Sequence, residues 1–436
     1  MMRSALRERS RRSRGLLLAL VTGVGVLVIG LLFPAYAGQA STGSGRPAGS
    51  AGRAGPLSPP AGGLRPGTTF TPVSASVISR PTPVKGTDGR YHLAYELLLT
   101  NLAPRRTRID RIEVTSPRTH KVLLSLAGRA LAADMNPIGS PPGVPAGTTM
   151  ASSAEWVVWL DVQAHSLADV PATLVQRAAG TILAARGAKA FRFDDVVDRV
   201  PVRRAAPVVL SSPVGAGVWY ASEGCCSDDT HHRRGLVAVN GQLMVPQRFA
   251  IDWFKLDARH RAWVGNPHRL TSYLSFRQPV YAAADGVVVG LQNGLPDNRP
   301  PEPPPIPPIA DTVGNHIVIK VAPGVYLLYA HLQNGSLLVH VGEHVRAGQM
   351  LARIGNSGNS TTPHLHFQIM TRPTFFPTDS RPYVFSHFDL IGQVTKRIWD
   401  DNIGLQPTGV LPFVPAHRPG SRVDELPLDR NVVRFP

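Results

Sequence analysis

The apolar positions of this 436-residue chain recur mainly with a period of two. From Tyr91 to Leu99, every second residue is a tyrosine or a leucine. Because side chains alternate between the two faces of a strand, this pattern predicts a strand with one buried face. Residues 108–115 and 156–162 are further strand candidates, separated by Pro/Gly-rich loops. Residues 70–202 are therefore predicted to form a β-sandwich-like accessory domain of immunoglobulin-like type.

A second β-rich unit is predicted over residues 207–390. Its strongest local signal is Asn240-Gly241, which joins residues 236–239 to 242–245 and suits the type I′ turn of a hairpin. Further strand candidates follow at 279–291, 315–321, 325–331 and 363–370. The two units together predict an all-β chain. Residues 391–436 have few periodic signals and are predicted to be a C-terminal extension that wraps the surface.

The first 37 residues have a different pattern. An Arg-rich start is followed by an almost wholly apolar run at 16–33, by Pro34 and by small residues at 35–37. These features predict a secretory signal peptide cut after Ala37. The alternative is an uncleaved N-terminal membrane anchor, because the run is near the shortest length that spans a bilayer. In both cases the rest of the chain is predicted to be extracytoplasmic, either secreted or associated with the cell envelope.

Composition adds a linker and a candidate partner. Residues 38–69 are rich in Gly, Ala, Ser and Pro, which predicts a flexible linker. The formal net charge of +17 favours anionic surroundings, such as nucleic acid, anionic lipid or anionic cell-wall polymers. No zinc-finger spacing or other nucleic-acid-binding signature accompanies this charge, so nucleic acid is not a predicted partner.

The only two cysteines, Cys225 and Cys226, are adjacent. A secreted protein without a spaced pair of cysteines has no ordinary disulfide framework. Adjacent cysteines either close a vicinal ring or stay as thiols. The sequence favours two small, half-buried loop residues.

Histidine and aspartate side chains give the second unit its candidate chemistry. His364 and His366 are two positions apart on a predicted strand, so they share one face, and a Gly-Asn-Ser-Gly-Asn-Ser turn at 355–360 precedes them. His331 ends another predicted strand, and Asp252 lies in an apolar one. Imidazoles aimed at one point can bind a metal ion, act as acid and base, or do both.

This part of the chain resembles the lysostaphin-type zinc endopeptidases, the LytM-like peptidoglycan hydrolases. The matching stretches are Ile251-Asp252, Pro279 to Val288, Gly314-Asn315, Tyr329 to Leu332, Val341 to Val345 with Gly348-Gln349, and Gly355 to Gln368. The resemblance covers the unit at 207–390, under half of the chain. It implies a β-sheet metallopeptidase domain that hydrolyses peptide bonds in the stem peptides or cross-bridges of peptidoglycan.

The resemblance also implies a role for each residue. Asp252 and His366 would bind Zn²⁺. His364 would be the general base, and His331 would orient the attacking water or stabilise the tetrahedral oxyanion. A catalytic zinc keeps about three protein ligands and one open position, and it lowers the pKa of a bound water to about 7. A neutral imidazole, with a reference pKa of about 6.5, can then accept the proton.

One position departs from the family. The family usually places its first zinc-binding histidine four residues before the aspartate, and Arg248, which is always charged, occupies that position here. We expect the hairpin to bring a ligand from its other strand instead. A two-residue turn would place His231 opposite Ala250, on the same face as Asp252, whereas a three-residue turn with a bulge would place His232 there. Both histidines are therefore candidate metal ligands.

Two other functions remain open. Arg248 at the usual ligand position is compatible with a catalytically inactive peptidase-like module that binds cell wall or regulates other wall hydrolases. The presence of Asp252, His331, His364 and His366 favours an enzyme, because a binding module does not need all four. The third hypothesis is an exported peptidase that acts on proteins.

Overall fold

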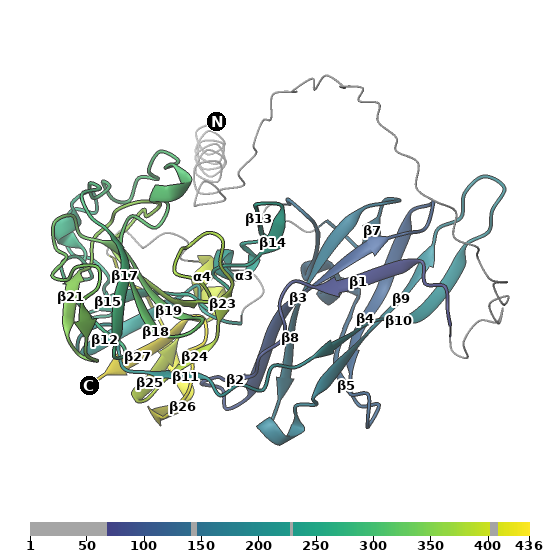
Figure 1. Ribbon diagram of the computed structural model, residues 1–436, viewed down its shortest axis with the longest axis horizontal. Helices are drawn as coiled ribbons and strands as arrows, with labels where there is room; N and C mark the ends of the chain where they lie inside the picture. Colours follow the sequence, from purple (N-terminus) through teal and green to yellow (C-terminus); the bar gives the residue numbers. More distant parts are fainter. Residues whose placement is uncertain (1–67, 141–145, 227–229, 402–408) are drawn as a thin grey trace, which may run out of the picture.

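A computed structural model describes residues 68–140, 146–226, 230–401 and 409–436 of the chain (Figure 1). The predicted signal segment at 1–37, and most of the predicted linker at 38–69, lie outside these residues. None of the helices that the structure describes is both long enough and apolar enough to cross a membrane.

The first domain is a sandwich of two antiparallel sheets, so the predicted β-sandwich is confirmed. The strands of one sheet are β1 (Val73–Val77), β2 (Val84–Lys85), β3 (Tyr91–Asn101), β8 (Glu155–Ala164) and β6 (Met135–Pro137). Those of the other are β10 (Phe191–Pro201), β9 (Thr173–Ile182), β4 (Thr107–Thr115), β5 (Val122–Ala127) and β7 (Thr149–Met150). Two short helices, α2 (Gly128–Ala133) and η1 (Leu167–Asp169), connect strands.

Strand β3 is buried on both faces, whereas the alternation in its sequence predicts a single buried face. Leu93, Tyr95 and Leu97 point into the sandwich core, as the alternation predicts. On the opposite face, Ala94 packs into the core of the second domain and Glu96 is fully buried. The second face is therefore covered by the neighbouring domain, which no local pattern could indicate.

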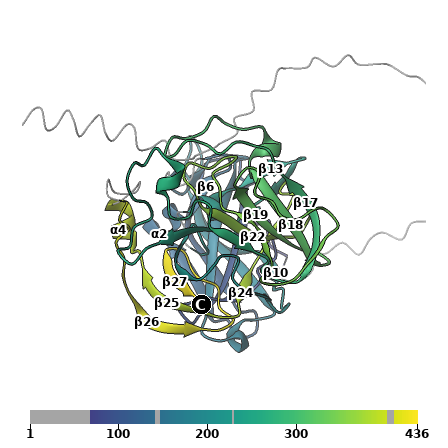
Figure 2. The ribbon, with the colours of Figure 1, turned by 90° about the vertical axis from the view of Figure 1, so that its left-hand side faces the viewer.

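The second domain is built on one large, almost wholly antiparallel sheet. The strands along it are β20 (His344–Val345), β17 (Gly286–Gln292), β18 (Asn315–Ala322), β19 (Val325–Leu332), β22 (Leu365–Met370), β15 (Ile251–Leu256), β12 (Gly217–Ser222), β27 (Asn431–Phe435), β25 (Phe388–Gln393) and β26 (Val414–Arg422), with β23 (Ser380–Arg381) paired to β22. Figure 2 shows β17, β18, β19 and β22 side by side. The all-β fold class and the strands predicted at 315–321, 325–331 and 363–370 are confirmed.

Smaller elements surround this sheet. They are the pairs β11 (Val208–Leu210) with β24 (Tyr383–Phe385), β16 (Pro279–Tyr281) with β21 (Met350–Arg353), and β13 (Val237–Val239) with β14 (Gln242–Met244), and the short helices α3 (His231–Arg234), η2 (Leu270–Ser272), η3 (Ile309–Asp311) and α4 (Lys396–Asp401). Figure 1 shows α3 and the β13–β14 hairpin at the boundary between the two domains.

The weak periodicity of residues 391–436 suggested that the end of the chain wraps the surface. The structure instead places its last strand inside the sheet. Strand β27 lies inside the sheet, between β12 and β25. Val432 and Val433 are fully buried there, and Phe435 is almost fully buried. A strand of five residues is too short to give a strong periodic signal, and the hydrogen bonds of its two neighbours hold it in the sheet.

The β13–β14 hairpin forms as predicted, but it does not reach the candidate histidines. Asn240 and Gly241 both have positive φ, 51° and 75°, as a type I′ turn requires. The ladder ends at Val237, and the residues before it form the helical turn α3. The side chain of Thr230 caps this turn by accepting a hydrogen bond from the Arg233 amide. The register argument that placed a histidine opposite Ala250 on a strand is therefore wrong.

Candidate metal centre

Three adjacent strands bring the candidate residues together. Strand β22 lies between β19 and β15, and His366 on β22 pairs with Asp252 on one side and with Ala330 on the other. Directly paired residues point to the same face of an antiparallel sheet, so Asp252 and His366 are neighbours. His364 precedes β22 by one residue, and His331 follows Ala330.

The Asp252 carboxylate is the centre of the cluster. Its Oδ1 lies 2.9 Å from His366 Nδ1 and 3.5 Å from His364 Nε2. Its Oδ2 lies 3.6 Å from Nε2 of His232, which approaches from α3. The His331 ring is 4.9 Å from the His364 ring and 5.8 Å from the His366 ring, measured between centroids. All five side chains are buried.

An oxygen acceptor holds the far nitrogen of each histidine. His232 Nδ1 donates to the Glu223 carbonyl at 3.0 Å and lies 3.3 Å from the Ala250 carbonyl. His364 Nδ1 donates to the Thr362 carbonyl at 2.7 Å, and His366 Nε2 donates to the Gln368 side chain at 2.9 Å.

The far nitrogen of His331 also has an oxygen acceptor, since its Nδ1 donates to the Ser357 carbonyl at 2.8 Å. Such acceptors fix the tautomer of an imidazole and leave its other nitrogen unprotonated. The second nitrogens, His232 Nε2 and His366 Nδ1, face the Asp252 carboxylate, and when both are unprotonated this donor arrangement can hold a metal ion.

The protonation states of the clustered side chains at neutral pH suit metal binding. Burial lowers the pKa of His232 to about 3 and holds the pKa values of His331 and His364 below 6.5. Burial also acts to raise the pKa of Asp252, but His232, His364 and His366 outweigh it, and the pKa lies well below 3.8. A charged Asp252 carboxylate beside a neutral His232 imidazole suits metal ligation.

His231 and His232 occupy different surroundings, although both are on α3. Ligand atoms of His231, His232 and Asp252 lie within 4.8 Å of one another, so this trio could also hold a metal ion. However, the His231 side chain is 49% exposed, and its Nδ1 lies 3.0 Å from the Glu223 carboxylate. His366 has the shorter approach to Asp252 and the buried position. The geometry therefore favours His232, Asp252 and His366 as the ligand set.

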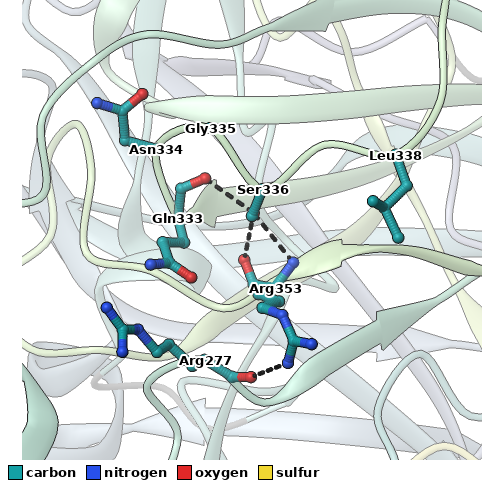
Figure 3. Close-up of a pocket in the computed structure, with 7 residues that line it drawn as sticks. All are labelled: Arg277, Gln333, Asn334, Gly335, Ser336, Leu338 and Arg353. Atoms are coloured by element: carbon teal, nitrogen blue, oxygen red, sulfur yellow. Dashed lines mark hydrogen bonds between the residues drawn. The ribbon is translucent and has the colours of Figure 1, made fainter.

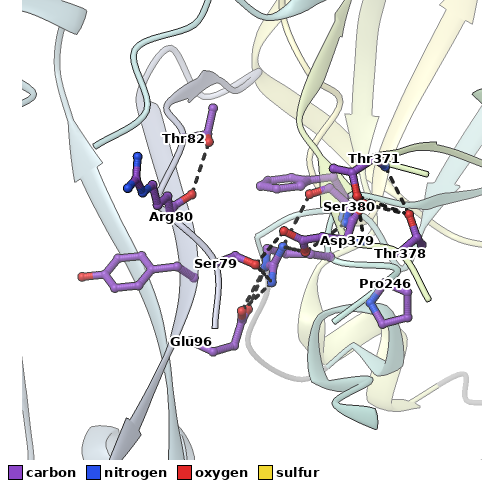
Figure 4. Close-up of polar contacts among 12 residues, drawn as sticks. Ser79, Arg80, Thr82, Glu96, Pro246, Thr371, Thr378, Asp379 and Ser380 are labelled. Atoms are coloured by element: carbon purple, nitrogen blue, oxygen red, sulfur yellow. Dashed lines mark hydrogen bonds and ion pairs between the residues drawn. The ribbon is translucent and has the colours of Figure 1, made fainter. Parts of the chain in front are cut away.

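Arg248, at the usual ligand position of the family, points away from this cluster. Its guanidinium is fully buried and bonds Glu96 of the sandwich at 2.6 Å and Asp379 at 2.7 Å. Figure 4 shows Glu96 and Ser79 of the sandwich facing Asp379 and Ser380 of the second domain. The ion pair between Arg248 and Asp252 that a plain structural role would predict is absent from the contacts of the described residues.

Sequence reasoning missed the residues that orient the ligands. Gln368 had a usable signal, because it is two positions beyond His366 and so shares its face. No sequence signal marked Glu223, because its backbone carbonyl accepts from His232 and its carboxylate pairs with His231. Contacts of that kind appear only when segments distant in the sequence are folded together.

The two cysteines form a vicinal disulfide, which decides between the alternatives that the sequence left open. Cys225 is fully buried in the core of the second domain. Cys226 lies beside His92 and Asp161 of the sandwich rather than in the histidine cluster. Its sulfur is bonded to Cys225, so it offers no thiolate to a metal at Asp252.

An open surface depression of about 520 Å³ lies elsewhere on the second domain (Figure 3). Its lining residues are Arg277, Gln333, Asn334, Gly335, Ser336, Leu338 and Arg353. Its side chains form few mutual contacts, among them the hydrogen bond from Arg353 to the Arg277 carbonyl at 3.0 Å. None of the clustered histidines lines it, so this depression is not the candidate centre.

Comparison with known proteins matches part of this region to a family. Residues 273–376 match the model of peptidase family M23. This stretch of the second domain is similar to M23 peptidases. The matched stretch includes His331, His364 and His366 but begins after Asp252, so the M23 match does not extend to the α3 side of the cluster. The resemblance to lysostaphin-type endopeptidases is confirmed.

The relatives match only part of the chain. The peptidoglycan DD-endopeptidase ShyA of Vibrio cholerae is 34% identical over 107 residues, 24% of this chain and 21% of that protein. The glycyl-glycine endopeptidase ALE-1 of Staphylococcus capitis is 32% identical over 122 residues, 28% of this chain and 29% of that protein. The chain thus spans under a third of the length of these curated relatives.

Among solved structures, the catalytic domain of lysostaphin from Staphylococcus simulans is similar at 24% identity. The match covers 33% of this chain and 80% of that domain, with a TM-score of 0.21. This likeness adds nothing to the fold described above.

Proposed function

We propose that this protein is an exported zinc metalloendopeptidase that hydrolyses peptide bonds in the stem peptides or cross-bridges of peptidoglycan. The observation that supports it most is the convergence of His232, His364 and His366 on one buried Asp252 carboxylate. A buried imidazole needs one acceptor in any fold, and what distinguishes this cluster is that the second nitrogens of these histidines converge on a single carboxylate.

In this proposal His232, Asp252 and His366 hold the zinc ion. Two imidazole nitrogens and one carboxylate oxygen are a ligand set of catalytic zinc, which leaves one coordination position open. When bound, the metal acts as a Lewis acid and lowers the pKa of a water molecule to about 7. Gln368 and the Glu223 carbonyl keep the two imidazoles in the tautomers that ligation needs.

His364 and His331 carry the proton chemistry. The Thr362 carbonyl accepts the Nδ1 proton of His364, so Nε2 is free to take the proton from the attacking water. This imidazole is neutral at pH 7, because burial lowers its pKa. His331, oriented by the Ser357 carbonyl, orients that water or stabilises the developing oxyanion.

The peptidoglycan substrate rests on a separate set of observations. Two relatives that match part of this chain are named peptidoglycan DD-endopeptidase and glycyl-glycine endopeptidase. The signal-like segment at 1–37 and the net charge of +17 suit a protein that meets anionic wall polymers. We expect binding to isolated cell walls to weaken as the salt concentration rises, because salt screens the attraction between the basic protein and anionic polymers.

The inactive-module hypothesis loses its main support. It rested on Arg248 at the usual ligand position, and His232 approaches the cluster from α3 instead. A peptidase that acts on proteins would use the same cluster, so only its substrate separates it from the wall hydrolase.

The test measures zinc content and hydrolysis on the purified full chain. We expect about one zinc per chain and cleavage of isolated peptidoglycan. Asp252→Ala should lose both zinc and cleavage, whereas His364→Ala should keep zinc and lose cleavage, since His364 is not in the ligand set. His340→Ala, at an exposed position outside the cluster, is the matched control and should keep both. Absence of zinc together with absence of cleavage would overturn the proposal, and cleavage of casein but not of peptidoglycan would favour the protein peptidase.

A further inference from the structure

The sandwich domain presents one fully buried carboxylate to the second domain. Glu96 lies on the face of β3 opposite the sandwich core and is 0% exposed. It forms ion pairs with Arg233 and Arg248, both also buried. A charge removed from water is costly unless it is paired and hydrogen-bonded, so this contact must be well formed whenever the domains are docked.

One of its partners is the neighbour of a proposed zinc ligand. Arg233 directly follows His232 on α3, and its guanidinium also donates to the Tyr95 carbonyl at 3.0 Å and the Leu160 carbonyl at 2.9 Å. All of these acceptors belong to the sandwich. The chain that carries His232 is thus bonded to the other domain one residue away from the imidazole.

The next residue, Arg234, is held in the same way. Its guanidinium donates to the side chains of Asp134 at 2.8 Å and Asn136 at 3.2 Å. The Trp159 ring lies 5.2 Å from the guanidinium carbons of both Arg233 and Arg234. Two consecutive arginines of α3 therefore bind the sandwich through charge, hydrogen bonds and an aromatic face.

Helix α3 cannot hold this position by itself. It has four residues, and helical segments of that length are not stable in isolation. Within the second domain, its polar contacts include the Thr230 cap, the bond from the Arg234 amide to the Thr230 carbonyl, and the contacts of His231 and His232 with Glu223, Ala250 and Asp252. The side chains of Arg233 and Arg234 add the bonds to the sandwich.

Arg248 connects this contact with the unusual ligand arrangement. The family resemblance places a histidine at this position, and here the arginine binds the same Glu96 carboxylate as Arg233 does. One carboxylate of the sandwich therefore binds both Arg248, at the family's usual ligand position, and Arg233, beside the proposed ligand His232.

We propose that the sandwich domain is a structural part of the metal centre, with Glu96 as the positioning residue that holds His232 in place through Arg233. This inference rests on the proposed zinc site. It identifies the role of the accessory domain: zinc affinity depends on domain docking, and a loosened contact weakens the metal site before either domain unfolds. The peptidase domain without the sandwich should hold zinc poorly, although its own ligands are all present.

The test compares matched variants of the full chain. Glu96→Gln keeps the shape of the side chain and removes the charge next to α3. Glu425→Gln is its control, because Glu425 pairs with Lys85 across the domain boundary at 2.9 Å, and among the described residues its ion pairs are with Lys85 and Arg422 rather than with α3. Asp134→Asn is a milder change on the α3 side, at a position with 14% side-chain exposure. Zinc affinity is measured by chelator competition, with circular dichroism to establish that each variant is folded.

We expect Glu96→Gln to lower zinc affinity about 10- to 100-fold, the usual effect of losing a group that orients a ligand. Asp134→Asn should lower it less, and Glu425→Gln should leave it unchanged. With Co²⁺ in place of zinc, the visible absorption of Glu96→Gln should change, because it reports ligand geometry. If Glu96→Gln does not fold, the comparison of Asp134→Asn with Glu425→Gln decides.

Two results would overturn the inference alone: unchanged zinc affinity in the folded α3-side variants, or an equal loss in Glu425→Gln. Absence of zinc from the unaltered chain, by contrast, overturns the proposed function itself. The two failures are therefore distinguishable in one set of measurements.

Discussion

The two walls of the candidate centre are built by different means. On the sheet wall, Asp252 and His366 face each other through strand pairing, and His364 precedes the same strand. On the helix wall, His232 projects from one helical turn that the neighbouring domain holds. The sheet wall is positioned by hydrogen bonds within one domain, and the helix wall by contacts between two. We therefore propose that the candidate centre is robust on the sheet side and depends on domain docking on the helix side.

The largest expected effect tests which histidine forms the helix wall. Loss of a group that hydrogen-bonds a metal ligand usually lowers metal affinity about 10- to 100-fold. His232→Ala removes a direct ligand, so zinc affinity should fall by at least that much. His231→Ala should leave the affinity near that of the unaltered chain, since this half-exposed side chain is paired with Glu223. Chelator competition on both variants measures the difference. The reverse order of effects would make His231 the ligand.

A second prediction concerns the sandwich that supports the helix wall. Burial opposes protonation of His92, but its contacts with Asp161 at 2.8 Å and Asp88 at 3.2 Å outweigh it and raise the pKa to about 10. Because the folded pKa is above the unfolded value of about 6.5, protonated His92 stabilises the fold fully below pH 6.5. That stability, of a few kcal/mol, should be lost as pH rises toward 10.

Thermal or denaturant unfolding between pH 6 and 10 measures this loss. His92→Gln should be less stable at pH 6 and should show a flatter pH dependence over the same range. Equal slopes for the two proteins would show that His92 is not protonated in the folded sandwich.

The smallest expected effect concerns the sheet wall. Gln368→Ala removes the acceptor of the His366 Nε2 proton, so zinc affinity should fall about 10-fold, at the lower end of the range for such partners. Gln368→Glu keeps an acceptor at that position and should bind zinc more tightly than Gln368→Ala. Zinc titration of the two variants provides the comparison. Equal affinities would mean that strand pairing alone orients His366.

The sequence predicted the sheet wall well because its signals are local. Alternation places His364 and His366 on one face, and apolar neighbours mark the strands that carry Asp252 and His331. The Asn240-Gly241 turn was also readable, because a type I′ turn needs only two residues with positive φ.

For the helix wall, the sequence predicted His231 and His232 as candidate ligands without deciding between them. The strand on which it placed them is wrong. His231 and His232 were expected on a strand continuing the hairpin, whereas Thr230 caps a helical turn there. The face of β3 that carries Glu96 was expected to be exposed, yet the second domain covers it. In both places a contact with a distant segment overrides the local pattern.

By itself the sequence determined the β-rich fold class and the shared face of His364 and His366, because each depends on residues within a few positions of one another. It also showed the resemblance to lysostaphin-type endopeptidases, through several short motifs in a fixed order along the chain. Only the tertiary structure decided that a buried His232 and a half-exposed His231 both lie near Asp252, and that Arg248 binds Glu96 rather than Asp252. Glu96 is 137 residues from Arg233 and 152 from Arg248. Pairing over such separations depends on how two folded domains dock, which local periodicity does not encode.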